Sequence, residues 1–552
     1  MMQPGLTQTV LENLLHHRLL LCIALVLLWL VRNRRYNGLN KYPGPLAASV
    51  SDLWRFIDVC KRRPEQTLMS LHERHGDVVR IGPGAISFAD PAALKTIYGL
   101  NNGFVKSDFY VVQQSVVNGK SLPSLFSTTD NSFHGKFRRC VNAAFSISAL
   151  VQYEPFVDNT TRLFLDQTKR LFVEEGRECD FTTWLQYYAF DVIGEITYSK
   201  RHGFVERNED VEGIIAHLSR LFLYVAPIGQ IPLLDRLLLK NPLFHKLSRW
   251  GLVDSTSPVA RFARSRMAER LAPIPEPGLP GPPPPPPPPP ANSSTGKKKK
   301  KPPGPDLLSK FIAAREDRPD FMTDTLVQTM AVSMAFAGSE TTAISLSSVF
   351  YHLLRNRSCY RKLQAEVDDA CAAAAAARPG SHGFFSDAVV TFAEAQKLPY
   401  LHACIQEAFR LHPAPGLPLE RVVPAGGAEI AGHHVRGGTI VGCSAWVIHR
   451  RPEVFGPDAD EYRPERWLPC PDRDAEDESR RIKNMASTML HFGMGSRTCI
   501  GKNISLLEIY KLVPSLLRKF NIDFEDSGRD WKITNAWFVK QSDFKVRFTC
   551  RE

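Results

Sequence analysis

The sequence predicts a mainly α-helical protein with small peripheral β-sheets. Of its 552 residues, 43% are hydrophobic, which is enough for an extensive core. Apolar residues recur with helical periodicity over five long segments, at 148–175, 182–200, 210–225, 323–355 and 394–411. Strand-like patterns occupy only three regions, at 77–88, 418–447 and 531–548, with Pro-Gly or Gly-Gly turns in the first two.

An apolar run of thirteen residues at 19–31 lies between Arg18 and the arginines Arg32, Arg34 and Arg35. At ~1.5 Å per residue this run spans about 20 Å of helix, less than the ~30 Å hydrocarbon core of a membrane. A cleaved signal peptide, a buried helix and a signal anchor are the three interpretations. No small-x-small cleavage site follows the run, and the arginines after it favour a cytoplasmic C-terminal side. We therefore expect a single N-terminal membrane anchor.

Two prolines, Pro43 and Pro45, follow the apolar run and predict a stiff hinge. We expect residues 1–46 to form the anchor and this Pro-rich hinge, and residues 47–552 to form one functional domain. A Pro/Lys-rich insertion at about 274–305 interrupts that domain with nine consecutive prolines and five lysines. Its composition predicts a disordered surface loop of polyproline II and coil, and the alternative is a ligand for aromatic-grooved partner modules.

The formal net charge of +12 owes five charges to the lysine run at 297–301, which leaves an excess of seven spread along the chain. We therefore expect no nucleic-acid binding, and the remaining charge suits a membrane surface or an acidic electron-donor protein. The eleven cysteines form no CxxC pair, so neither a disulfide framework nor a structural zinc site is expected.

One cysteine, Cys499, sits in a glycine-rich stretch that begins at Phe492 and ends at Gly501. The glycines, Gly493 among them, permit tight turns and a close approach of the backbone to a flat ligand. Arg497 supplies a fixed cation suited to a carboxylate. A helical pattern begins after Gly501, and its N-terminal dipole favours a thiolate. A lone cysteine is more often a core residue, but the full pattern Phe-x-x-Gly-x-Arg-x-Cys-x-Gly is much more specific.

This pattern resembles the haem-ligand loop of the cytochrome P450 family. The resemblance implies a cytochrome P450 fold, with haem b between a long distal helix and a proximal loop that carries the cysteine. It also implies that Cys499 binds the haem iron as a thiolate, and that Phe492, Gly493 and Gly501 lie against the cofactor. Thiolate ligation pushes electron density to the iron and favours cleavage of the O–O bond.

Two charged residues, Glu407 and Arg410, are spaced i,i+3 on a predicted helix and share one face. Taken alone, they would be a solvated surface pair. In the family that the chain resembles, such a pair joins a later arginine, here Arg466, in a buried triad that locks the core behind the haem. A buried charge needs such partners.

The segment Ala-Gly-Ser-Glu-Thr-Thr at 337–342 lies within a long helical pattern from about Thr323 to Asn356. A glycine inside a helix costs ~1 kcal/mol relative to alanine, so Gly338 has a packing or functional reason. The resemblance implies that Thr341 stabilises bound oxygen together with a water, and that Glu340 relays protons. Without Cys499 downstream, an ordinary kinked core helix would be the better interpretation.

His134 and Arg138 are spaced i,i+4 and reach one carboxylate from one helix face. The resemblance implies that both bind haem propionates, together with Arg497 and Arg421. The family often has tryptophan at the position of His134, and many fungal members have histidine.

Details of these motifs resemble the pisatin demethylase-like group of fungal enzymes. The implied function is a haem-dependent monooxygenase that inserts one atom of O₂ into a lipophilic small molecule, such as a secondary metabolite. No flavin or NADPH domain is evident, so NADPH–cytochrome P450 reductase would supply electrons, with cytochrome b5 as an optional second donor. The predicted location is the endoplasmic reticulum membrane, with the catalytic domain facing the cytosol.

Docking of the electron donor would use a basic proximal face formed by Arg497, Lys502 and Lys511. Substrate contacts would come from four aromatic and apolar segments, at 109–125, 221–233, 413–419 and 537–538. Two other functions stay open: a haem-thiolate isomerase or dehydratase that needs no reductase, and a non-enzymatic haem sensor. Glu340 and Thr341 argue against both.

Overall fold

The structure is a computed structural model that describes residues 4–117, 120–243, 246, 250, 258–271, 306–376 and 389–551. The expected Pro/Lys-rich insertion at 274–305 lies outside the described residues.

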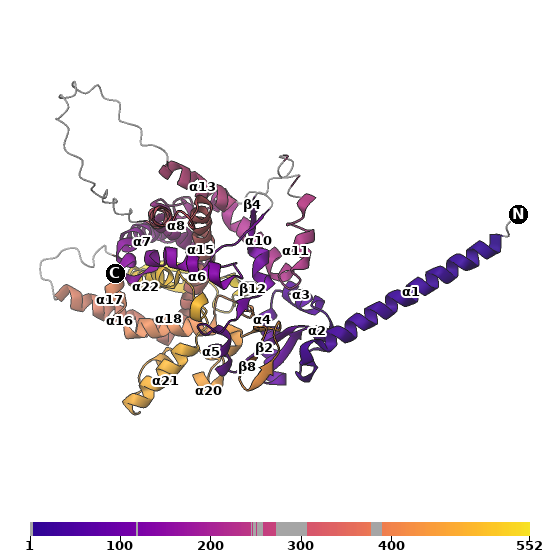
Figure 1. Ribbon diagram of the computed structural model, residues 1–552. Helices are drawn as coiled ribbons and strands as arrows, with labels where there is room; N and C mark the ends of the chain where they lie inside the picture. The colour runs from indigo at the N-terminus through magenta and orange to yellow at the C-terminus, as the bar shows by residue number, and fades with distance from the viewer. Residues whose placement is uncertain are drawn as a thin grey trace, which may run out of the picture.

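The first helix, α1 (Pro4–Arg34), runs outward from the body of the protein (Figure 1). Its segment His16–Arg34 is apolar enough to cross a membrane, and none of that segment is buried. Nineteen residues of helix extend about 28 Å, close to the ~30 Å thickness of the hydrocarbon core. The apolar run at 19–31 alone is shorter than that thickness. The segment Val211–Ile228 passes the same composition test, but 39% of it is buried and it belongs to the body.

A buried arginine, Arg80, holds the end of α1 against the body, in addition to hydrogen bonds from the Asn33 side chain to the Val50 carbonyl and from the Arg34 side chain to the Ser49 hydroxyl. The Arg80 guanidinium donates to the backbone carbonyls of Asn33 (2.8 Å) and Arg34 (2.7 Å) in the last turn of α1. It also donates to the carbonyls of Gly82, Pro83 and Ser49. A cation at the C-terminus of a helix satisfies free carbonyls and complements the helix dipole. The junction therefore consists of an α1 end that is hydrogen-bonded to strand β1.

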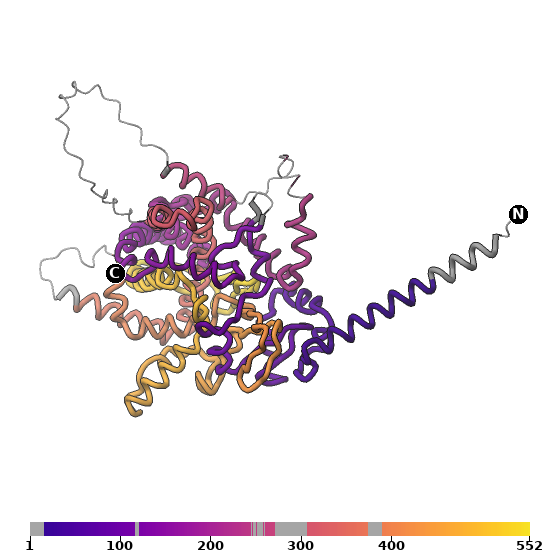
Figure 2. The backbone as a smooth tube through the Cα atoms, in the orientation of Figure 1, coloured from indigo at the N-terminus to yellow at the C-terminus, as the bar shows by residue number. Residues whose placement is uncertain are grey.

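The largest sheet has five strands in the order β1-β2-β10-β7-β3. It pairs N-terminal strands with strands more than 300 residues later, and Figure 2 shows these indigo and orange segments side by side. Its strands are β1 (Val78–Gly82), β2 (Ala85–Phe88), β3 (Val105–Lys106), β7 (Arg421–Val422) and β10 (Ile440–Gly442).

The remaining strands form four small sheets: β11-β14-β6, β12-β13, β4-β5 and β8-β9. Their bounds are β4 (Ser115–Val117), β5 (Lys120–Leu122), β6 (Cys179–Asp180), β8 (Ala428–Ile430), β9 (His433–Val435), β11 (Phe520–Phe524), β12 (Lys532–Ala536), β13 (Phe538–Ser542) and β14 (Lys545–Cys550).

The core is helical and centres on α8 (Phe181–Tyr198) and α15 (Asp324–Arg355), with α7 (Ile147–Thr168) and α22 (Lys502–Lys519) packed around them. All residues of α8 except Thr183 are buried. Thr323 caps α15, whose bounds match the predicted 323–355 segment. The sheet-bearing part lies between α1 and this helical part (Figure 1).

The other helices cover this core and the five-stranded sheet. Their bounds are α2 (Leu46–Val50), α3 (Leu53–Cys60), α4 (Pro64–His75), α5 (Ala92–Tyr98), α6 (Asn131–Val141), α9 (Phe204–Arg207), α10 (Ile214–Ile228), α11 (Leu233–Leu237), α13 (Pro258–Leu271), α14 (Leu307–Asp317), α16 (Arg357–Ala376), α17 (Phe392–Ala395), α18 (Pro399–Leu411), α19 (Ala445–Ile448), α20 (Pro452–Phe455) and α21 (Ala475–Thr488).

The prediction of a mainly helical fold with small peripheral sheets is confirmed. The prediction of one continuous helix at 394–411 is wrong, because this segment forms two helices, α17 and α18. Leu398 is extended between them, as expected for a residue that precedes a proline, here Pro399. Strand β11 was missed, because it directly continues the periodic helix α22.

Candidate functional site

The loop that carries Cys499 is a tight turn closed on itself. The Cys499 amide donates to the carbonyl of Phe492 (2.8 Å), so the two ends of the loop meet. Gly493 and Gly495 have φ angles of +66° and +65°, in the left-handed region that favours glycine. A Cβ at Gly495 would lie 1.8 Å from the carbonyl oxygen of Tyr98, so this position excludes side chains.

The Cys499 side chain is accessible although dense protein surrounds it. That surrounding protein raises the pKa of the Cys499 thiol, while hydrogen bonds from the amides of Gly501 and Lys502, and the charge of Arg138, act to lower it. Helix α22 begins at Lys502 with Gly501 as its N-cap. The amides at this helix start are donors suited to a thiolate. The Cys499 thiol is therefore accessible and has backbone donors beside the sulfur.

Aromatic packing supports the loop. His491 lies flat on Phe409, with ring centroids 4.0 Å apart, and Phe492 meets Phe409 edge-on at 5.5 Å. His491 Nε2 also contacts the Ser345 hydroxyl (3.3 Å), which ties the loop to α15. These contacts fix the loop between α15 and α18.

Glu407, Arg410 and Arg466 are brought together in the interior. Glu407 accepts two hydrogen bonds from Arg410, both 2.8 Å, and one from Arg466 Nε (3.2 Å). Trp467 Nε1 and the Arg463 amide also donate to Glu407. All three side chains of the triad are at most 1% exposed. The carboxylate is thus fully hydrogen-bonded, the condition under which a buried ion pair is tolerated.

The middle of α15 has one accessible face. Ala337 is exposed and Thr341 is partly exposed, whereas Ser339, Glu340 and Thr342 are buried. The Thr341 hydroxyl donates to the Ala337 carbonyl (2.6 Å). A Cβ at Gly338 would lie 2.9 Å from two side-chain atoms of Ile193, so glycine here lets α8 pack close against α15. The predicted packing reason for Gly338 is therefore confirmed.

Four cations, Arg138, Lys106, Arg421 and Arg497, gather with His134 beside the Cys499 loop. Burial, together with the charges of Arg497, Arg138, Lys106 and Arg421, lowers the pKa of His134 to about 3. Its imidazole is therefore neutral and offers an N–H group rather than a charge. Lys106 was not predicted, because Val-Lys-Ser gives no motif on its own. Only the structure reveals that Lys106 belongs to this group, because it lies directly opposite Arg421 in the β3–β7 pair.

No described hydrogen bond or ion pair joins these cations to a carboxylate. Arg497 donates to the Thr128 carbonyl and to Asn131, and its buried Nε has no partner. Burial and Arg421 lower the pKa of Arg497 to about 10. Arg138 donates to the carbonyls of Ser496 and Thr498 in the cysteine loop. A group of cations that forms no described ion pair with a carboxylate fits an anionic ligand.

The expected basic face of Arg497, Lys502 and Lys511 is wrong for Lys511. That side chain is fully buried and pairs with Glu154 (2.6 Å) and Asp158 (2.7 Å). The helical periodicity of α22 turns Lys511 into the core. Arg497 is partly buried within the cation group, and Lys502 is exposed.

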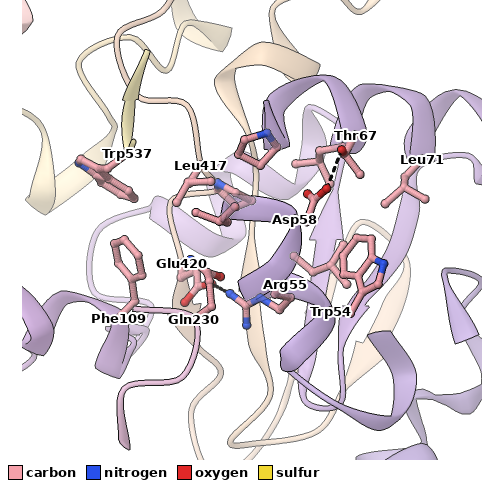
Figure 3. A pocket seen from close by; sticks show the side chains of 15 residues that line it. Trp54, Arg55, Asp58, Thr67, Leu71, Phe109, Gln230, Leu417, Glu420 and Trp537 are labelled. Carbon is pink, nitrogen blue, oxygen red and sulfur yellow. Dashed lines mark hydrogen bonds and ion pairs between the residues drawn. The ribbon is translucent and has the colours of Figure 1, made fainter. Parts of the chain in front are cut away.

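The four predicted apolar segments meet in one cluster. Phe109, Ala226, Leu417 and Trp537 each come from a different segment and are buried together. Phe109 and Trp537 are 4.8 Å apart between ring centroids. Both line a cavity of about 40 Å³ with the Arg55–Glu420 ion pair (Figure 3). Cys499 does not line this cavity, whose volume suits a few waters rather than a drug-sized molecule.

Comparisons with known proteins agree with this geometry. The cytochrome P450 family model matches residues 43–548. Cytochrome P450 monooxygenase cicH of Emericella nidulans is 39% identical over 515 residues, which cover 93% of this chain and 94% of the relative. A cytochrome P450 monooxygenase of Aspergillus terreus is 38% identical over 489 residues, 89% and 91% of the two chains. Cytochrome P450 monooxygenase gsfF of Penicillium aethiopicum is 33% identical over 527 residues, 95% and 96% of the two chains.

The fold and the cysteine loop thus define a haem-thiolate oxygenase. The chain belongs to the cytochrome P450 family. Members of this family contain haem-thiolate iron, use O₂ and take electrons from a redox partner. Both the accessible Cys499 and the unpaired cation group of this chain fit a haem with its two propionates.

Proposed function

We propose that this protein is a haem b monooxygenase that hydroxylates, demethylates or epoxidises a lipophilic secondary metabolite. One observation carries the proposal. The loop that presents Cys499 also places Arg497 in a partly buried group of cations, so one loop combines an iron ligand with a cation for a propionate. Residues 1–46 act as anchor and hinge, and residues 47–552 form the catalytic domain.

Cys499 would bind the haem iron as a thiolate. Phe492, Gly493 and Gly501 frame the cofactor on that side. Haem with this ligand supplies reductive activation of O₂, with one atom entering the substrate and the other leaving as water. Glu407, Arg410 and Arg466 hold the core behind the loop.

The cation group binds the two propionates. The members predicted from the sequence are His134, Arg138, Arg421 and Arg497, and the structure adds Lys106. His134 donates an N–H hydrogen bond, and the others supply charge. Arg138 also holds the carbonyls of the cysteine loop, so it links the propionate side to the thiolate.

Thr341 and Glu340 are the catalytic pair. The accessible Thr341 hydroxyl holds a water beside the oxygen site, and the buried Glu340 carboxylate relays protons to it. The substrate is held by the apolar cluster that includes Phe109, Leu417 and Trp537. This cluster favours a lipophilic molecule.

Electrons come from a separate NADPH–cytochrome P450 reductase, with cytochrome b5 as an optional second donor. The exposed cations Lys502 on α22 and Lys136 and Arg139 on α6 lie on elements that contact the cysteine loop, and they suit an acidic partner. Helix α1 anchors the protein in the endoplasmic reticulum membrane, and the arginines at its C-terminal end keep the catalytic domain in the cytosol.

The test is reconstitution of the purified full-length haem protein with NADPH–cytochrome P450 reductase and a panel of lipophilic secondary metabolites. Candidates are first ranked by spectral titration of the haem band. We expect NADPH oxidation that depends on reductase and is accelerated by a ligand, with one oxygen atom from ¹⁸O₂ in the product. Turnover of a ligand without reductase would instead indicate an isomerase or dehydratase, and ligand binding without any turnover a sensor.

A further inference from the structure

Helix α15 is joined to both ends of the cysteine loop by side-chain contacts. Just before the loop, His491 Nε2 contacts the Ser345 hydroxyl at 3.3 Å. Just after the loop, the hydroxyl of Ser505 on α22 accepts a hydrogen bond from the Thr342 hydroxyl (3.0 Å). Both contacts reach the same turn of α15, at 341–345. We call these two contacts the bridges between the loop and α15.

The direction of the first bridge follows from the other bond of Ser345. The Ser345 hydroxyl donates its hydrogen to the Thr341 carbonyl (2.8 Å). The contact at 3.3 Å is therefore a hydrogen bond only if His491 Nε2 carries the proton and donates it. Burial, together with the charges of His412 and Lys502, lowers the pKa of His491 to about 3. The ring is thus neutral at physiological pH, and its one N–H group is at Nε2.

These bonds form a directed chain from the loop to Thr341. The His491 N–H group donates to the Ser345 hydroxyl, which donates to the Thr341 carbonyl. A hydroxyl that accepts a hydrogen bond becomes a stronger donor. A hydroxyl that bonds to the carbonyl four residues earlier also loosens and bends a helix. The local path of α15 at Thr341 therefore depends on Ser345, and through it on His491.

His491 is poorly suited to a purely structural role. Its Nδ1 is buried and has no hydrogen-bond partner among the residues that the structure describes, which is unfavourable for a buried acceptor. The imidazole lies flat on Phe409, with ring centroids 4.0 Å apart. A phenylalanine ring could make the same stacking contact without burying an unpaired nitrogen. What the histidine adds is the bond to Ser345.

We propose that His491 and Ser505 are positioning residues that hold the turn of α15 carrying Thr341 in register with the loop that presents Cys499. Each of them acts through a hydroxyl group of α15. No covalent bond changes, and no proton is transferred along these contacts. The bridges keep the Thr341 hydroxyl and the Cys499 sulfur at one separation, so the water held by Thr341 keeps its place relative to the thiolate. This inference rests on the proposed roles of Cys499 and Thr341.

The first test is NADPH oxidation by the holoenzyme with purified reductase and no added organic substrate. Reduction of O₂ to hydrogen peroxide consumes one NADPH per O₂, and full reduction to water consumes two. We expect His491→Phe to raise the ratio of peroxide to water about fivefold, the weight of one neutral hydrogen bond. Ser345→Ala removes the acceptor of the same bond and should have the same effect. Ser348→Ala is the matched control, because its buried hydroxyl donates to the Ala408 carbonyl (3.2 Å) of α18, and it should leave the ratio unchanged.

Combined variants show whether the two side chains act through one bond. The double variant of His491→Phe and Ser345→Ala should match either single variant, whereas additive effects would overturn the first bridge. Ser505→Ala should also raise peroxide, and an unchanged ratio would remove Ser505 from the proposal. If Thr341→Ala leaves the ratio unchanged, the proposed oxygen handling is wrong. If Thr341→Ala raises peroxide but His491→Phe and Ser345→Ala do not, only the bridge is overturned.

The second test needs no turnover. Hydrogen–deuterium exchange of the ferric holoprotein should accelerate in both joined segments, 341–345 and 491–501, when His491→Phe or Ser345→Ala breaks the bridge. The C–O stretching band of the reduced carbon monoxide complex should broaden in the same variants and stay unchanged in Ser348→Ala.

Stability separates positioning from a merely structural role. Urea unfolding of His491→Phe should stay close to the wild type, because the variant loses one hydrogen bond and one unpaired nitrogen together. If His491→Phe folds without haem, Ser345→Ala, which leaves the loop sequence intact, decides the test. Unchanged exchange at 341–345 and at 491–501 in Ser345→Ala would overturn the bridge whatever the kinetic results.

Discussion

The side chains of Lys106 and Arg421 lie directly opposite each other on the paired strands β3 and β7, and both residues are 6% exposed. Two like charges in register across an antiparallel pair destabilise a sheet. The Lys106 ammonium donates to the Phe126 carbonyl and lies 4.0 Å from the Tyr110 ring centroid. Among the residues that the structure describes, no carboxylate forms an ion pair with either cation. An anionic cofactor group between them would turn this repulsion into attraction.

Replacing Lys106 by methionine should therefore weaken haem binding. We expect haem loss to accelerate by about tenfold, the effect of losing ~1.5 kcal/mol of charge-assisted hydrogen bonding. Transfer of haem to apomyoglobin measures this rate. Lys95→Met, at an exposed lysine of α5, is the control and should not change it. Equal haem loss in both variants would remove Lys106 from the propionate site.

Cys499→Ser should abolish the red-shifted band of the reduced carbon monoxide complex, because an alcohol replaces the thiolate donor. The measurement is the difference spectrum of the purified variant. The buried Cys404→Ser variant is the matched control and should retain the band. Persistence of the band in Cys499→Ser would show that another residue binds the iron.

Glu407→Ala should yield protein without haem or with strongly reduced stability. The change leaves Arg410 and Arg466 buried without their shared carboxylate, which typically costs ~3–5 kcal/mol. Urea unfolding and the haem-to-protein absorbance ratio measure the two effects. Glu453→Ala removes an exposed carboxylate paired with Arg451 and should behave like the wild type. Normal haem content and stability in Glu407→Ala would contradict the structural role.

Thr341→Ala should retain haem and divert reducing equivalents to hydrogen peroxide, because the hydroxyl that holds the water is lost. Peroxide formed per NADPH oxidised is the measurement. Thr329→Ala is a control in the same helix, since the Thr329 hydroxyl makes an equivalent bond to the Thr325 carbonyl (2.7 Å). An unchanged peroxide yield in Thr341→Ala would reject its role in oxygen handling.

Local sequence patterns predicted much of the fold and of the candidate site. Helix α15 was predicted to within a residue of its bounds, because a cap at Thr323 and a continuous apolar pattern define it. Glu407, Arg410 and Arg466 were placed together through the resemblance, and the structure brings them into one hydrogen-bonded group. These features depend on short motifs and on helix periodicity, which a single sequence displays.

Features that depend on long-range pairing were not predicted. Lys106 faces Arg421 only because β3 and β7 pair across more than 300 residues, and nothing in either short strand indicates that register. Lys511 was placed on the surface from its charge alone, whereas its contacts with Glu154 and Asp158 arise from the packing of α7 on α22. The contacts of Glu340 with Gln186 and Lys540 likewise join three distant segments.

The hydrogen bonds of Arg80 to the last turn of α1 have a mechanical consequence. A flexible linker between a membrane-embedded helix and its domain would let the domain reorient freely relative to the membrane. Here the guanidinium of Arg80 donates to the backbone carbonyls of both Asn33 and Arg34, and Arg80 itself lies on strand β1 of the five-stranded sheet. With α1 as the proposed anchor, the tilt of this helix in the lipid would therefore set the orientation of the five-stranded sheet relative to the membrane.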